Sequence, residues 1–217
     1  MTKIPTPFTL TLNEALEAAG QGDPAAQNQL GFVYTHGQGV SKNYATALYW
    51  YHESADQGFD KAQNNIGRMY EHGFGVPKNY ATAMLWYQKA AEQKYAIAQY
   101  GIGNMYANGL GVTQDYTTAA LWFKKSADQE YAVAQYNMGV LYNNGQGVPQ
   151  SFATAAQWFQ KAAERGDGDA QNKLGLMYTY GNGVPEDCKQ AAMWFQKAIE
   201  NGNDDADINM KLMFKKI

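Results

Sequence analysis

The chain has 217 residues, of which 45% are hydrophobic and 14% aromatic, so it carries enough apolar surface to fold. Its 17 basic and 20 acidic residues give a net charge of -3, which argues against nucleic acid as a partner. Cys188 is the only cysteine, so no intramolecular disulfide can form. No stretch resembles a membrane span or the apolar core of a secretory signal. We therefore expect a cytoplasmic protein, or a periplasmic or secreted one if a leader has been removed.

The N-terminal residues precede any periodic pattern. Pro5 and Pro7 stand in a stretch without helical spacing, which predicts an N-terminal arm over residues 1–10. Apolar residues then follow at helical spacing and predict a capping helix over residues 11–22. Asp23 and Pro24 supply an N-cap and a first-turn proline for the next helix.

Five copies of one 36-residue unit fill the rest of the chain. Gly67, Gly73, Gly75 and Trp86 have equivalents at this fixed interval without any insertion. Such self-similarity predicts a stacked array in which each repeat is a pair of helices, A and B. With a capping helix and a final helix, the array should contain about 12 helices in a single domain over residues 11–217. We place the repeats near residues 25–60, 61–96, 97–132, 133–168 and 169–204, and the final helix over residues 205–217.

Each repeat contains residues that mark where its helices begin and end. The glycine inside helix A, Gly67 in the second copy, is costly in a helix and predicts close contact with a neighbouring helix. The loop glycines Gly73 and Gly75 suit a left-handed C-cap and a further turn. Residues of preferred capping type stand before every helix B: Asn43, Asn79, Asp115, Ser151 and Asp187.

Residues 62–91, AQNNIGRMYEHGFGVPKNYATAMLWYQKAA, resemble the Sel-1-like repeat family, which is related to the tetratricopeptide repeats. The resemblance covers nearly the whole chain. It implies an all-α, right-handed superhelical solenoid in which helix A of each repeat lines a concave groove. It also implies an adaptor that assembles protein complexes, and bacterial members are often linked to host interaction or to immunity against secreted toxins. A cysteine-rich branch is associated with β-lactams, but its paired cysteines are missing here because Cys188 stands alone.

By analogy with tetratricopeptide grooves, the inward positions of helix A are those of Asn28, Phe32, Thr35 and His36. Asparagine can bond an extended peptide backbone, and tyrosine offers apolar area with a polar tip, so these rows suit a protein segment. The rows read Asn28, Asn64, Tyr100, Tyr136, Asn172; then Phe32, Arg68, Asn104, Val140, Leu176; then His36, His72, Asn108, Asn144, Tyr180.

Two apolar loop tips form a second candidate surface. Phe74 and Leu110 each stand between two loop glycines, where the other copies carry a polar residue. Neighbouring exposed apolar tips can mark a contact surface, although packing onto the next repeat explains them equally well.

The residues offer little support for catalysis. His36 and His72 occupy the same repeat position, and stacked equivalents do not converge on a metal or acid–base site. The GQGVSK loop lacks the spacing of a phosphate-binding loop, and Cys188 replaces an aromatic residue with no histidine nearby in sequence. We expect a monomeric, non-enzymatic scaffold without cofactor or metal that binds a protein segment in the groove. The alternatives are a bacterial immunity protein and, from the cysteine-rich relatives, a β-lactam-binding protein or β-lactamase.

Overall fold

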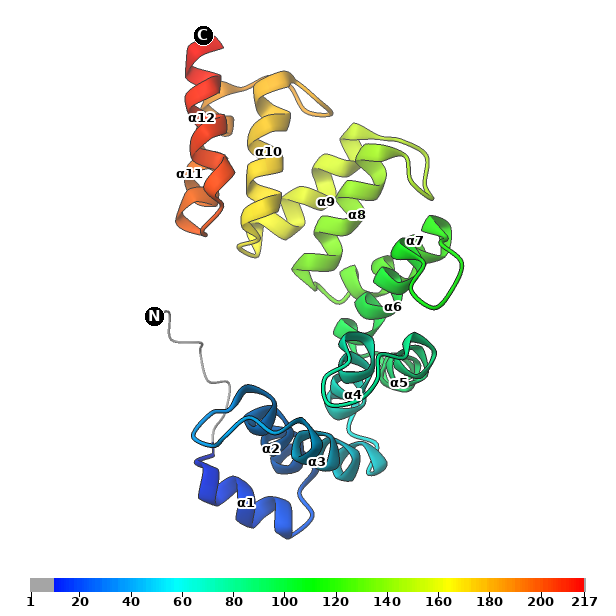
Figure 1. The fold of residues 1–217 in the computed structure, drawn as a ribbon. Helices are drawn as coiled ribbons and strands as arrows, with labels where there is room; N and C mark the ends of the chain where they lie inside the picture. Colours follow the sequence, from blue (N-terminus) through cyan, green and yellow to red (C-terminus); the bar gives the residue numbers. More distant parts are fainter. Residues whose placement is uncertain (1–9, 217) are drawn as a thin grey trace. The chain divides into compact units, whose positions relative to one another are not determined.

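The computed structural model describes residues 10–216, and this part of the chain contains twelve helices and no strand, as the repeat pattern predicts (Figure 1). The predicted N-terminal arm therefore lies outside the described residues except for Leu10, as does Ile217. The helices are α1 (Leu12–Gly20), α2 (Pro24–His36), α3 (Tyr44–Asp56), α4 (Asp60–His72), α5 (Tyr80–Glu92), α6 (Ala96–Asn108), α7 (Tyr116–Ala127), α8 (Ala132–Asn144), α9 (Phe152–Glu164), α10 (Gly168–Tyr180), α11 (Cys188–Glu200) and α12 (Asp204–Lys216).

The chain divides into two compact units, Met1–Ala98 (unit 1) and Gln99–Ile217 (unit 2). In unit 1, α1 packs on α2, α2 on α3, α3 on α4 and α4 on α5. In unit 2, the helices from α7 to α12 likewise pack each on the next. Because each of these helices packs on its sequence neighbours, both units are built as solenoids of helix pairs.

Local signals set the helix boundaries where the sequence places them. The side chains of Asn43 and Asn79 accept backbone N–H bonds at the starts of α3 and α5, and Asp115, Ser151 and Asp187 do the same at later B helices. Helix A ends at a glycine in the left-handed conformation, for example Gly37 with φ 70° and Gly73 with φ 75°. These caps satisfy backbone groups that would otherwise be unpaired at the helix ends.

The helix A glycine is the point of closest approach within a repeat, as predicted. A Cβ atom at Gly67 would lie 2.7 Å from the Tyr87 ring, and one at Gly103 would lie 2.5 Å from the Phe123 ring. Gly31, Gly139 and Gly175 face the equivalent rings in the same way. The glycine therefore lets an aromatic side chain of helix B lie directly against the backbone of helix A.

The repeated tryptophan of helix B is not fully buried in most of the repeats. Trp194 is buried, but the equivalent residues of the other four repeats are half-buried. The Lys89 ammonium lies 4.2 Å from the centre of the Trp86 ring, and the Lys125 ammonium lies 4.0 Å from that of Trp122. The fully buried ring is the residue that follows, such as Tyr87 or Phe123. A row of lysines near the end of helix B, Lys89, Lys125, Lys161 and Lys197, thus lies over the tryptophan rings in cation–π contacts.

Candidate protein-binding surface

A small pocket in unit 1 joins several of the predicted binding residues. It has a volume of about 50 Å³ and lies between α2 and α4, with α3 and the loop after α4 closing its sides. We call it the α2–α4 pocket. Its lining residues are Phe32, Thr35, His36, Tyr51, Asn65, Arg68, Met69 and Phe74.

One wall of the α2–α4 pocket is aromatic. The rings of Phe32 and His36 stack with their centres 3.8 Å apart, and His36 Nδ1 lies 2.9 Å from the Phe32 carbonyl oxygen. The ring of Phe74 stacks on Tyr44 of α3 at 5.4 Å. This packing fixes the rings before any partner arrives, which lowers the entropy cost of a contact with them.

The lining of the α2–α4 pocket also carries polar groups. The Tyr51 hydroxyl lies 3.4 Å from Thr35 Oγ1, and the Thr35 hydroxyl donates to the Gly31 carbonyl oxygen at 2.8 Å. Burial raises the pKa of Tyr51 to about 12, against smaller opposing effects of the Thr35 bond and the Arg68 charge. Tyr51 therefore stays protonated at neutral pH and acts as a hydroxyl donor rather than a base. Beside it, the exposed Arg68 offers planar donors to an oxygen-bearing group.

The equivalent tyrosine of the second repeat also carries its hydroxyl into a polar contact. Tyr87 donates to the Glu71 carboxylate on α4. Its pKa is raised by burial first and by Glu71 second, while Arg68 acts in the opposite direction. Arg68 thus influences both buried hydroxyls of unit 1.

The asparagines at the first predicted groove position are partly withdrawn from solvent. Asn28 Oδ1 accepts a hydrogen bond of 2.9 Å from Asn65 on the next helix A. Asn64 is only 3% exposed, and its Oδ1 atom is buried without a hydrogen-bond partner. In unit 2, Asn172 is 8% exposed and accepts a bond from Asn209. Of these three residues, Asn28 retains some surface for a partner.

The predicted tyrosines of unit 2 pack on the phenylalanines below them. The ring centres of Tyr100 and Phe123 are 5.6 Å apart, as are those of Tyr136 and Phe159. Both tyrosines are half-buried, so part of each ring stays accessible. Burial raises the pKa of Tyr136, with smaller contributions from the carboxylates of Asp169 and Asp167.

The remaining predicted residues vary in exposure. His72 is exposed, and its ring lies 5.3 Å from that of Phe74, so the end of α4 borders the α2–α4 pocket. Tyr180 is 55% exposed at the end of α10. Leu110, the other loop tip, is half-buried in unit 2, whereas Phe74 belongs to unit 1. Asn104, Val140 and Leu176 are half-buried, and Asn108 and Asn144 are exposed.

Sequence reasoning missed three members of the α2–α4 pocket. Asn65 and Met69 lie one position beyond the predicted rows, and Tyr51 lies on helix B, whereas the predicted groove rows contain only helix A positions. The sequence does contain one indication that Tyr51 is special. The equivalent position holds tyrosine in two repeats and phenylalanine in the other three: Tyr51, Tyr87, Phe123, Phe159 and Phe195.

Within residues 10–216, no three histidine, cysteine, aspartate or glutamate side chains are placed to hold a metal ion. The His36 ring lies against Phe32, and the His72 ring lies against Phe74. None of the described helices is long and apolar enough to cross a membrane.

The family follows from the repeats themselves. A family description named Sel1 repeat matches residues 24–59, 60–95, 96–131, 132–167 and 168–203, each one residue earlier than the spacing predicts. The chain belongs to the Sel1 repeat family. No curated protein sequence matches it significantly.

Solved Sel1 structures share this fold. A protective antigen present in uropathogenic Escherichia coli strains is 36% identical with a TM-score of 0.86; the match covers 94% of this Sel1 chain and 44% of the antigen. This chain thus spans less than half of that protein. A Sel1 repeat protein from Oxalobacter formigenes is 37% identical, with a TM-score of 0.81 and coverage of 92% and 79%. An immunity protein from Pseudomonas aeruginosa, 21% identical with a TM-score of 0.64 and coverage of 92% and 78%, shares the fold alone. Sel1 repeats typically form non-enzymatic scaffolds for protein partners.

Proposed function

We propose that this Sel1 protein is a non-enzymatic scaffold that holds a segment of a partner protein on its A helices, with the α2–α4 pocket as the anchor. The observation that carries this proposal is the convergence of Phe32, His36, Arg68 and Phe74 on one pocket. Three of these residues come from the predicted groove rows and one, Phe74, from the loop tips, so the proposed anchor draws on both candidate surfaces; the other loop tip, Leu110, lies in unit 2.

The chemistry of the pocket defines the segment that fits it. The stacked rings of Phe32 and His36 suit an apolar side chain, and the donors of Arg68 and Tyr51 suit an adjacent carbonyl or carboxylate oxygen. Interface hot spots are enriched in aromatic residues and arginine, and the lining of the pocket contains both.

Affinity capture with one matched pair of variants tests the proposal. Arg68→Glu reverses the charge in the pocket, whereas Lys61→Glu makes the same change at an exposed residue in the first turn of the same helix. We expect tagged Arg68→Glu to lose the partner that the wild-type protein captures from its source organism, by at least tenfold in mass-spectrometric signal, and Lys61→Glu to retain it.

Circular dichroism controls for folding in this experiment. Both variants should keep the helical spectrum of the wild-type protein, because both side chains are exposed. Equal loss of the partner in both variants would indicate general electrostatic attraction. Equal retention would remove the α2–α4 pocket as the anchor.

Toxin immunity is a narrower form of the same proposal. The fold likeness to immunity proteins of Pseudomonas aeruginosa motivates it. If it holds, co-expression of this protein should restore growth to cells that produce the toxin encoded beside it, and Arg68→Glu should abolish the rescue. Growth arrest that wild-type protein does not relieve would reject this form while leaving the scaffold proposal intact.

A further inference from the structure

A row of buried glutamines joins each helix B to the helix A that follows. Gln27, Gln63, Gln135 and Gln171 donate through Nε2 to backbone carbonyl oxygens near the end of the preceding helix. In four of the five repeats, the glutamine oxygen accepts from a side-chain carboxamide thirty positions later. The pairs are Gln57 with Gln27 at 2.8 Å, Gln93 with Gln63 at 2.9 Å, Gln129 with Gln99 at 2.8 Å and Asn201 with Gln171 at 3.0 Å.

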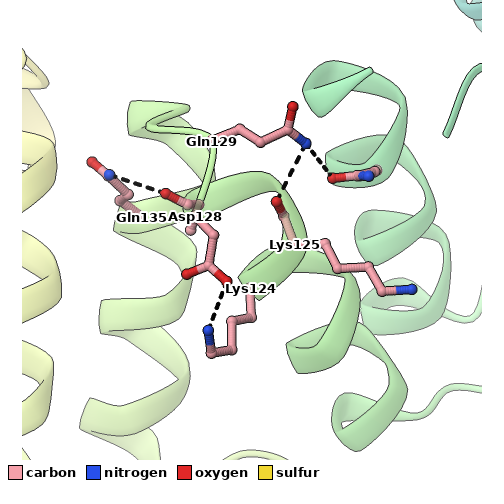
Figure 2. Close-up of polar contacts among 7 residues, drawn as sticks. Lys124, Lys125, Asp128, Gln129 and Gln135 are labelled. Carbon is pink, nitrogen blue, oxygen red and sulfur yellow. Dashed lines mark hydrogen bonds and ion pairs between the residues drawn. The ribbon is translucent and has the colours of Figure 1, made fainter. Parts of the chain in front are cut away.

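The fourth repeat breaks this row. Arg165 stands at the position of the carboxamide donor, and its guanidinium pairs with the Glu130 carboxylate at 2.8 Å. Gln135 is 3% exposed, and its Oε1 atom is left buried without a hydrogen-bond partner. Figure 2 shows Gln135 bonded through its nitrogen to the backbone beside Asp128, while its oxygen points away with no bond drawn to it. A buried unpaired acceptor is costly, so the site should gain from a donor.

Gln135 lines a pocket that lies entirely within unit 2. The pocket has a volume of about 420 Å³, and its wall includes Glu130, Lys161, Glu164 and Arg165. In the earlier repeats, Gln93 also donates to the Gly58 carbonyl oxygen and Gln129 to the Lys125 carbonyl oxygen. The equivalent residues at this pocket are Glu130 and Lys161, both in its lining. In the fourth repeat no side-chain carboxamide stands beside these residues, because Arg165 occupies the donor position.

We propose that this Gln135 pocket binds a side-chain carboxamide, from an asparagine or glutamine of a partner protein, with Gln135 Oε1 accepting its N–H. The four internal pairs show that the equivalent position in the other repeats accommodates this group. The contact lies in unit 2 and does not depend on the α2–α4 pocket.

A neutral carboxamide fits the Gln135 oxygen better than a cation does. Asp128 is paired with Lys124 at 2.7 Å, as Figure 2 shows, and Glu130 with Arg165 at 2.8 Å, so the charges of these two carboxylates are compensated. Glu164 accepts a 2.9 Å bond from the neutral Gln160, and Lys161 in the same lining supplies a positive charge that opposes an incoming ammonium group. An ammonium group buried against the neutral Gln135 oxygen would also lose its hydration.

Nuclear magnetic resonance of the full-length, ¹⁵N-labelled protein tests the proposal with three probes of similar size. Propionamide carries the donor, propionate lacks it, and propylammonium is a cation. We expect propionamide to shift the Gln135 side-chain amide signals in a saturable manner, and the other two probes to leave them in place. Saturable shifts with propylammonium but not with propionamide would overturn the proposal, as would no saturable shift with any probe.

Two variants test whether a chemical-shift change at Gln135 arises from binding at the carboxamide position that Arg165 replaces. Arg165→Gln supplies an internal carboxamide, so it should abolish the response to propionamide and raise the melting temperature by about 2–4 °C. Gln129→Ala removes the donor from the preceding repeat and should give the Gln99 side-chain amide the response that Gln135 shows. A response that persists in Arg165→Gln, or that fails to arise at Gln99 in Gln129→Ala, contradicts the assignment of the site.

Discussion

The two units use the same scaffold but place a hydroxyl group differently. In unit 1, the ring against the helix A glycine is a tyrosine, and Tyr51 and Tyr87 carry their hydroxyls toward Thr35 and Glu71. In unit 2, the equivalent ring is a phenylalanine: Phe123, Phe159 and Phe195.

This difference in ring type is accompanied by a difference in the side chains on helix A of each unit. In the first two repeats of unit 2, the hydroxyl-bearing rings are Tyr100 and Tyr136, which lie over the phenylalanines. In unit 1, the corresponding positions hold Asn28 and Asn64, which leaves the buried tyrosine hydroxyls beside Arg68. One exchange between two positions thus places a tyrosine hydroxyl in the lining of the α2–α4 pocket in unit 1 and half-buried tyrosine rings on the helix A surface in unit 2. The last repeat follows neither pattern, because Asn172 accompanies Phe195.

The largest effect should come from filling the glycine contact. Gly67→Ala places a Cβ atom against Tyr87, whose hydroxyl is held by Glu71, so we expect the free energy of unfolding to fall by about 2–3 kcal/mol. Gly139→Ala should cost less, because the Phe159 ring has no hydroxyl to restrain it. Chemical denaturation followed by circular dichroism measures both. Gly20→Ala is the control, since nothing lies within 4 Å of its Cβ position. A smaller cost at Gly67 than at Gly139 would contradict the role of the hydroxyl.

Alkaline pH should reveal the buried hydroxyl of the first repeat. The unfolded chain loses the Tyr51 proton near pH 10, at the ordinary tyrosine pKa, whereas the folded protein holds it to about 12. The folded state binds more protons in this interval, so the free energy of unfolding falls as the pH rises, by at most about 1.4 kcal/mol per pH unit. Tyr51→Phe should reduce this slope in denaturation experiments at pH 9 to 12. Tyr49→Phe, at an exposed position of the same helix, should not. Equal slopes in wild type and Tyr51→Phe would contradict the pKa shift.

The smallest effect concerns the outer surface. Unit 2 has a lysine over the tryptophan of every repeat, but the first repeat of unit 1 has Glu53 where the lysine would stand, three positions after Trp50. Glu53→Lys should add the missing contact and raise the free energy of unfolding by about 0.5 kcal/mol. Glu53→Gln removes the negative charge without adding the cation and serves as the control. If both variants have the same stability in urea, the cation–π contact contributes nothing measurable.

Part of the lining of the α2–α4 pocket could be predicted from the sequence, and the reason for each omission is physical. Phe32, His36, Arg68 and Phe74 were identifiable because they vary between repeats whose scaffold positions agree. Tyr51 was missed because adjacent positions on a helix differ by about 100° in direction, and periodicity alone does not show which of Trp50 and Tyr51 faces the glycine. Gln135 was missed because its missing partner lies on another helix, thirty residues away.

The repeat length, the helix boundaries and the family can be derived from the amino-acid sequence, because capping residues, left-handed glycines and apolar periodicity act within a few residues of where they stand. Which side chains share a pocket, and which polar atoms lack a partner, depends on how the helices pack on one another. Arg165 illustrates the distinction. The sequence shows that this residue departs from the repeat pattern, but only the packed helices show that its guanidinium pairs with Glu130 and that the Gln135 oxygen has no hydrogen-bond donor. Such outcomes depend on competition between partners brought together by packing, which no local pattern records.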